Sequence, residues 1–140
     1  MELMEQCQIW NENSEYQKII DALEAVPAEQ RTAEMDSELA RAYNNLAQPQ
    51  DRELFEKAIG LLEPHEEYFA GDHCWNFRMG YAWFYLDRED RALGYFEKAL
   101  EARPGDEDTL QLIEACRRGL ATASVIVVGR AQYRPWESPK

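Results

Sequence analysis

Two short strings of this chain repeat almost letter for letter, and each is followed by a proline. Residues 55–59 read FEKAI and residues 96–100 read FEKAL, with Pro64 and Pro104 a few positions further on. Proline lacks an amide hydrogen and clashes with the preceding turn, so each string is expected near the end of a helix. Self-similarity of this kind is typical of folds that stack copies of one small unit. The sequence therefore predicts a helical repeat protein.

The clearest copy of the unit spans residues 73–106. Its first helix carries a large apolar, a small and an aromatic residue, and a second helix follows a polar turn in which Asp87 is the candidate N-cap. Small side chains let two helices approach closely, and larger neighbours fill the remaining space. The pattern consists of Met79, Gly80 and Trp83, followed by Ala92, Phe96, Ala99 and Pro104.

This pattern resembles the tetratricopeptide repeat, a pair of antiparallel helices with a period of about 34 residues. The resemblance implies an all-α fold, namely a right-handed superhelix of three helix-turn-helix repeats near 1–34, 35–72 and 73–106. A capping helix is expected at 107–121, with Leu110 and Ile113 on its inner stripe. Stacking of neighbouring units would then bury the apolar faces that each pair leaves exposed.

The two upstream units follow the pattern less closely. The middle unit has Leu39, Ala40 and Tyr43 in the expected order, Pro49 after its first helix, and about six surplus residues after Pro64 relative to the usual period. In the first unit Gln6 replaces the large apolar residue, although Cys7 and Trp10 fit the next two places. Its second helix is expected to open at Ser14 and to close before Pro27.

The composition changes after Ala121. Residues 122–140 have no helical period and contain a β-branched run at 124–128, so an extended tail is expected. The tail is apolar and carries a positive balance of charge, unlike the acidic body, and opposite charges favour docking. It is expected to lie on the repeats of its own chain or of a neighbouring chain, a frayed end being the alternative.

Composition excludes several classes of protein. The 140 residues carry a formal net charge of −12, so general binding to nucleic acid is not expected. Neither a membrane span nor a signal peptide is recognisable, which favours a single soluble domain in the cytoplasm. Cys7, Cys74 and Cys116 lack the spacing of a disulfide frame or a zinc site. His65 and His73 lack partner ligands, and no phosphate-binding or nucleophile motif occurs, so we expect no metal, no cofactor and no enzymatic activity.

The resemblance places a concave groove along the first helices of successive units. Helical spacing assigns to it Ser37, Glu38 and Cys74 and, as the residues proposed to bind a partner, Arg41, Asn44, Asn45, Phe77, Arg78, Tyr81, Phe84 and Tyr85. Aromatic rings, amides and arginines together suit an extended peptide. For Arg78, a salt bridge to a nearby acid or stacking on Tyr81 is the alternative to ligand contact, and for the aromatics it is packing between repeats.

The best-known use of this family is capture of the acidic tails of heat-shock chaperones by a clamp of Lys, Asn, Asn, Lys and Arg. Only Arg78 fills one of those five places; the other four hold Met4, Gln8, Glu38 and Cys74. Because Glu38 would repel a carboxylate, this role is not expected. We predict instead an adaptor that performs no chemistry of its own and binds a protein or a peptide. The acidic body would steer the approach of this partner, so a basic partner is favoured. The alternative is a self-assembling scaffold that uses the tail to form homo-oligomers.

Overall fold

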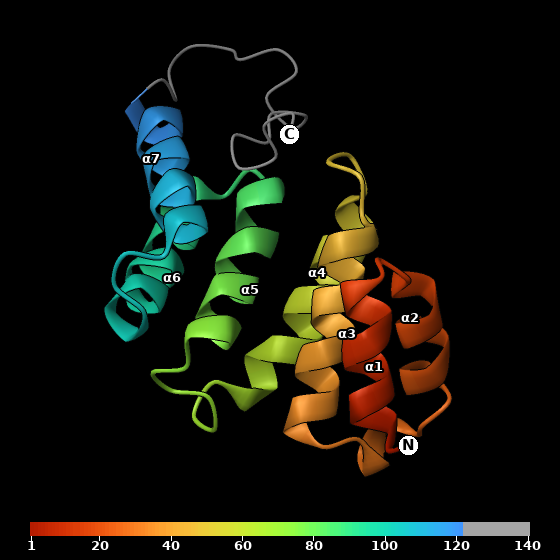
Figure 1. Ribbon diagram of the computed structural model, residues 1–140. Helices are drawn as coiled ribbons and strands as arrows, with labels where there is room; N and C mark the ends of the chain where they lie inside the picture. Colours follow the sequence, from red (N-terminus) through yellow and green to blue (C-terminus); the bar gives the residue numbers. More distant parts are fainter. Residues whose placement is uncertain (122–140) are drawn as a thin grey trace.

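The structure is a computed structural model that describes residues 1–121 (Figure 1). All regular secondary structure in this range is helical, as the sequence predicts, and the expected tail at 122–140 lies outside the described residues. The α-helices are α1 (Leu3–Glu12), α2 (Tyr16–Glu24), α3 (Ala33–Leu46), α4 (Arg52–Leu62), α5 (His73–Tyr85), α6 (Glu89–Ala102) and α7 (Glu107–Ala121). Two short 3-10 helices, η1 (Ala28–Gln30) and η2 (Glu63–His65), lie in the connections.

Two α-helices correspond to each of the three expected units and α7 follows them, although α3 begins at Ala33, two residues before the expected start of the second unit. Each helix packs against the next one along the chain, and α3 also packs against both α1 and α5. Figure 1 shows the helices ranged across the molecule from α1 and α2 at one side to α6 and α7 at the other. The first helices of the units, α1, α3 and α5, therefore lie in succession next to one another.

Polar side chains mark the starts of α3, α5 and α7. Each accepts a hydrogen bond from the backbone amide three residues later, at 3.1 Å for Thr32, 2.8 Å for Asp72 and 3.1 Å for Asp106. Such caps satisfy amides that have no partner within the helix. The C-terminal ends of four helices agree with the positions of the prolines, as predicted. The helices α2, α3, α4 and α6 end shortly before Pro27, Pro49, Pro64 and Pro104.

Two of the expected helix starts are wrong. Ser14 and Asp87 have positive φ angles of 59° and 61°, so they form the left-handed turns that follow α1 and α5. The N-cap positions of α2 and α6 are instead Glu15 and Arg88. Small polar residues suit both kinds of position, and the sequence alone did not separate the end of one helix from the start of the next.

Of the two residues expected on the inner stripe of α7, one is correct and one is wrong. Ile113 is buried, but Leu110 is 45% exposed, and the buried residues near it are Thr109 and Leu112. Asp106 caps the helix through Thr109, since the hydroxyl and the amide of Thr109 both donate to its Oδ2. This bond turns Thr109 toward the body of the protein, and Leu110, 100° further round the helix, faces away.

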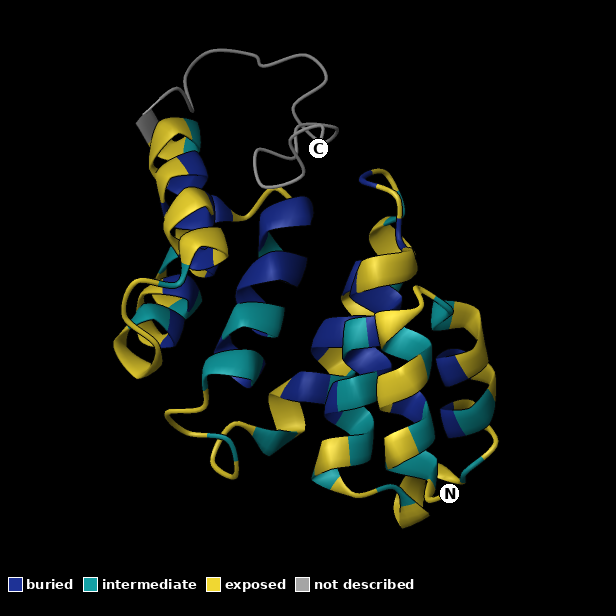
Figure 2. Cartoon of the chain, in the orientation of Figure 1, coloured by how far each residue is buried: buried dark blue, intermediate teal, exposed yellow. Residues whose placement is uncertain are grey.

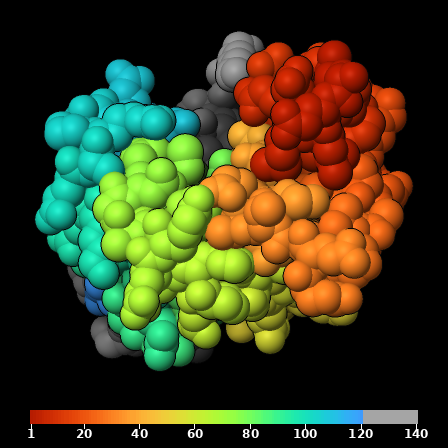
Figure 3. Space-filling view, turned by 90° about the horizontal axis from the view of Figure 1, so that it is seen from below, coloured from red at the N-terminus to blue at the C-terminus, as the bar shows by residue number. Residues whose placement is uncertain are grey.

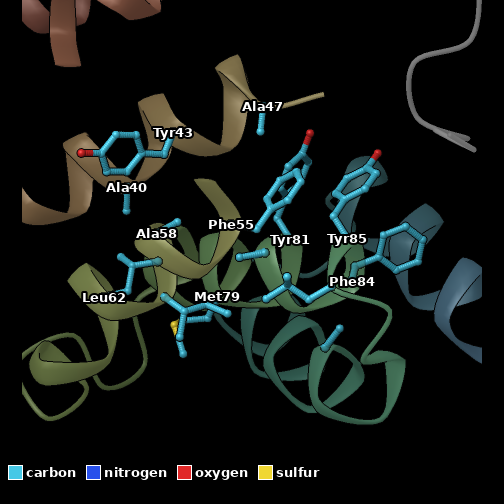
Figure 4. Close-up of a cluster of buried hydrophobic side chains, with 14 of the residues drawn as sticks. Ala40, Tyr43, Ala47, Phe55, Ala58, Leu62, Met79, Tyr81, Phe84 and Tyr85 are labelled. Carbon is cyan, nitrogen blue, oxygen red and sulfur yellow. The ribbon is translucent and has the colours of Figure 1, made fainter. Parts of the chain in front are cut away.

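The core runs continuously through the stacked helices (Figure 2). Figure 4 shows Phe55, Tyr81 and Tyr85 with their rings side by side, and the rings of Phe55 and Tyr85 stack with centroids 5.1 Å apart. Small residues such as Ala40 and Ala58 are fully buried where helices approach each other. The helix α5 is buried around most of its circumference because it packs against α3, α4 and α6.

Candidate functional site

A cavity of about 260 Å³ lies between α3, α5 and the segment that leads into α7. In Figure 3, seen from below, the red and orange N-terminal segments lie at one side and the cyan segment at the other, with yellow-green and green segments between them. The cavity is lined by Arg41, Asn44 and Asn45 of α3, by His73, Cys74, Phe77, Arg78 and Tyr81 of α5, and by Arg103, Asp106 and Asp108.

Six of the eight residues that the sequence assigned to a groove therefore line one cavity. The two others, Phe84 and Tyr85, do not line it, because they are buried at the far end of α5 with exposures of 5% and 1%. Tyr85 stacks on Phe55 of α4, and the ring of Phe84 meets that of Tyr85 edge-on. For Tyr85 the structure shows packing between helices, the alternative that the sequence left open, and Phe84 belongs to the same buried cluster.

His73, Arg103, Asp106 and Asp108 were not predicted for this site from the sequence. Arg103, Asp106 and Asp108 lie between α6 and the second residue of α7, where the expected third unit ends and the expected cap begins. The sequence signal for this segment is Asp106, which lies three residues before Thr109. This is the spacing of an N-cap residue, which fixes where the chain enters a helix.

The carboxylate of Glu38 links two arginines of the cavity, Arg41 and Arg78. Its Oε2 accepts a short hydrogen bond from Arg41, and its Oε1 lies 3.4 Å from Nη2 of Arg78. Arg78 also donates to Oγ of Ser37 at 2.6 Å, so this side chain of α5 is tied to two residues of α3. Burial lowers the pKa of Arg78, and the charge of Glu38 acts in the opposite direction. Glu38 thus serves as counter-ion to both arginines.

Asn44 sits at the centre of the contact between α3 and α5. Its Nδ2 donates to the backbone carbonyl of Arg78 at 3.2 Å, and the residue is 3% exposed. The other amide atom, Oδ1, is buried without a hydrogen-bond partner among the described residues, and the same holds for Nε of Arg41 one turn earlier. An unmatched acceptor and an unmatched donor on the same face of α3 are the groups that a bound ligand would satisfy.

His73 and Asp106 form the opposite wall. Nδ1 of His73 lies 2.8 Å from the carbonyl oxygen of Ala99, which can only accept, so Nδ1 carries the proton. Nε2 of His73 lies 3.9 Å from Oδ2 of Asp106. Burial on its own would raise the pKa of Asp106, but the two hydrogen bonds from Thr109 and the charges of His73 and Arg103 outweigh it and hold this pKa below its usual value.

The three cysteines lie in different surroundings. Cys7 and Cys116 are fully buried, and burial raises the pKa of the Cys116 thiol to about 12. Burial, followed by the charge of Glu38, also raises the pKa of Cys7. Cys74 is half-buried and lines the cavity. A thiol reagent therefore has a route to Cys74 through the cavity.

Among known proteins, no protein-family model matches this chain, and no curated protein matches it. None of the helices within residues 1–121 has the length and apolar character that crossing a bilayer requires. Within the same range no group of three or more His, Cys, Asp or Glu side chains is placed to hold a metal ion. The class established for the described chain is an all-helical, repeat-like protein with one cavity between α3, α5 and α7.

Proposed function

We propose that this chain is a tetratricopeptide-type repeat protein that binds an extended segment of a partner protein in the cavity between α3, α5 and α7, and that it performs no chemistry of its own. The order of contacts supports the repeat type, since each helix packs on the next and α1, α3 and α5 follow one another. Stacked helix pairs of this kind leave an extended concave surface for binding.

The unmatched polar atoms on α3 are the observation that carries the proposal. Oδ1 of Asn44 needs a donor and Nε of Arg41 needs an acceptor, and a peptide backbone supplies both groups at every residue. A backbone amide that donates to Asn44 would satisfy a group whose burial otherwise costs free energy.

The aromatic side of the cavity would hold a side chain of the bound segment. Phe77 and Tyr81 lie one turn apart on α5 with ring centroids 6.2 Å apart, and both line the cavity. Their rings are held in place, because Phe77 also packs on Phe96 and Tyr81 packs on Phe55. Rigid aromatic rings offer contact area with little loss of side-chain entropy.

Charge within the cavity differs from charge over the whole chain. The lining contains Arg41, Arg78 and Arg103 against Asp106 and Asp108, although the chain as a whole carries a net charge of −12. We therefore assign the acidic surface to long-range attraction of a basic partner, and the cavity itself to a segment of mixed or neutral character. Binding should then weaken as salt increases, through slower association.

The test is selection of peptides from a display library on the purified protein, followed by affinity measurements on a variant whose cavity is filled. Asn45 suits this purpose because it is exposed, lines the cavity and, among the described residues, forms a long side-chain hydrogen bond of 3.4 Å to Asn11. The selected peptides should bind Asn45→Trp at least about tenfold more weakly, as expected when a ring occupies the site.

Asn13→Trp is the matched control, since Asn13 is exposed at the end of α1 and outside the cavity. Its affinity for the selected peptides should equal that of the unmodified protein. Equal binding by the two tryptophan variants, or a library that yields no peptide, would contradict the proposed function. Repeating the titrations at low and high salt measures the contribution of the acidic surface.

A further inference from the structure

A second cavity, of about 510 Å³, lies away from the first and does not share a residue with it. It is bounded by the connection between α4 and α5, by the first turn of α5 and by the end of α6. Its lining includes Glu66, Gly71, Trp75, Asn76, Lys98 and Glu101. The connection contributes Glu66 and Gly71, so this cavity depends on the surplus residues that follow Pro64.

The floor of the second cavity holds an unmatched polar group. Asn76 is 2% exposed, and its Nδ2 donates to the backbone carbonyl of Asp72 at 2.8 Å. Its Oδ1 is buried with no hydrogen-bond partner among the described residues. Because an amide oxygen can only accept, the group that completes this site has to carry a hydrogen-bond donor.

The carboxylates at the rim of the second cavity favour a positively charged donor. Glu66 and Glu101 are exposed carboxylates, and Lys98 is the one cation that residues 1–121 contribute to the lining. Nζ of Lys98 lies 5.8 Å from the centre of the Tyr95 ring, so this ammonium is placed over an aromatic face. Burial, and then the charges of Glu66 and Glu63, raise the pKa of Tyr95, which agrees with a negative potential on this side of α6.

Trp75 forms the apolar part of the floor. Its indole is 2% exposed and is fixed by the hydrogen bond from Nε1 to the carbonyl of Leu62 at 2.9 Å and by edge-on contact with Tyr95. A rigid indole next to a carboxylate rim suits a methylene chain that ends in a cation. The volume of the cavity lies in the range of small-molecule sites.

We propose that the second cavity binds an alkylammonium group, with the ammonium donating to Oδ1 of Asn76 and facing Glu66 and Glu101, and with its methylene chain against Trp75. The same chemistry is offered by a free diamine and by a lysine side chain of another protein. This site is independent of the peptide cavity proposed above, so either proposal can fail without the other.

The experiment is isothermal titration of the full chain with 1,4-diaminobutane and with Nα-acetyl-lysine amide, at low salt. Tetramethylammonium is the matched probe for Nα-acetyl-lysine amide, because both carry a single positive charge and tetramethylammonium has no N–H donor. The two amines should saturate one site, with the tighter of them identifying the source, and tetramethylammonium should bind at least about tenfold more weakly, the effect of one lost hydrogen bond to a charged group.

Asn76→Leu removes the acceptor and should weaken amine binding about tenfold or more, whereas Asn13→Leu, at an exposed asparagine outside both cavities, should leave it unchanged. Should Asn76→Leu fail to fold, Ala102→Trp fills the cavity from its exposed rim and should abolish binding. Equal affinity for tetramethylammonium, or amine binding that survives both substitutions, would show attraction to an acidic surface and overturn the assignment. So would the absence of saturable binding, which would mean that water completes the site.

Discussion

Gly80 of α5 lies so close to the ring of Phe96 of α6 that a Cβ atom on it would be 2.6 Å from Cε1 and 2.7 Å from Cδ1. The ring has no room to withdraw, because Phe96 is fully buried and also packs against Phe77, with centroids 5.7 Å apart. A glycine within a helix costs up to about 1 kcal/mol relative to alanine. Close packing of α5 on α6 offsets that cost here.

Gly80→Ala is therefore expected to destabilise the protein by about 1 to 3 kcal/mol, the usual range for overpacking a core, despite the better helix propensity of alanine. Urea unfolding followed by circular dichroism measures the change. Gly94→Ala on α6 is the control, because a Cβ there meets nothing within 4 Å, and it should stabilise by about 0.5 to 1 kcal/mol. If both substitutions stabilised the protein, the close approach of the two helices would be wrong.

Glu38→Gln should destabilise the protein by about 2 to 3 kcal/mol, because it leaves Arg41 and Arg78 largely buried without a counter-ion. The side chains of Arg78, Glu38 and Arg41 are only 12%, 18% and 20% exposed, so water replaces the lost charge poorly. Chemical denaturation at pH 7 gives the difference in the free energy of unfolding.

The control for Glu38 is Glu53→Gln on α4. Glu53 pairs with Lys57 at 3.8 Å, but its side chain is 85% exposed. An exposed pair contributes at most about 1 kcal/mol, so this variant should stay within about 0.5 kcal/mol of the unmodified protein. A loss of equal size in the two variants would show that Glu38 does not hold the arginines.

Asp106 should make stability depend on pH. Its pKa is lowered in the folded state, so its charge stabilises the fold above the unfolded pKa, and this contribution is lost as the pH falls through the folded pKa. Asp106→Asn keeps a capping oxygen but removes the charge, and is expected to cost less than about 1 kcal/mol at pH 7.

The measurement for Asp106 is urea unfolding of the unmodified protein and Asp106→Asn at several pH values between 7 and 2. The difference between them should be largest at pH 7 and should shrink below about pH 4, the usual range for an aspartate. A difference that stayed constant down to pH 2 would mean that the charge of Asp106 does not contribute.

The three cysteines should differ in their rates of alkylation. At pH 8, iodoacetamide should modify Cys74 at least about tenfold faster than Cys7 or Cys116, because the latter two are fully buried and burial raises the pKa of both thiols. Peptide mass mapping over time gives the three rates. A peptide selected for the first cavity should slow the reaction of Cys74 alone. Similar rates at all three cysteines would contradict the described burial.

Several features of the fold were recognisable in the sequence because they depend on neighbouring residues. Proline ends a helix through its own ring and its missing amide, so Pro27, Pro49, Pro64 and Pro104 marked helix ends correctly. The small residue Gly80 identified a place where α5 and α6 approach closely. Helical spacing also brought Arg41, Asn44, Asn45, Phe77, Arg78 and Tyr81 to one cavity.

Other features depended on contacts between distant parts of the chain. Ser14 and Asp87 suit a cap and a left-handed turn equally, and the angle at which the next helix packs decides between them. Phe84 and Tyr85 follow the same spacing as Tyr81, yet the end of α5 is covered by its neighbours while its middle borders the cavity. Spacing gives the direction of a side chain but not what lies opposite.

The sequence by itself determined that this chain forms paired helices, where most of them end, and which faces carry small residues, because these properties follow from local sterics and periodicity. Only the tertiary structure decided the partners of the charged and polar groups. Glu38 is shared by two arginines, Asn44 and Asn76 each retain a buried oxygen that has no hydrogen-bond partner within residues 1–121, and Asp106 both lines a cavity and caps α7. The physical reason is that hydrogen bonds and ion pairs depend on distances across helix contacts, which no repeat in the sequence specifies.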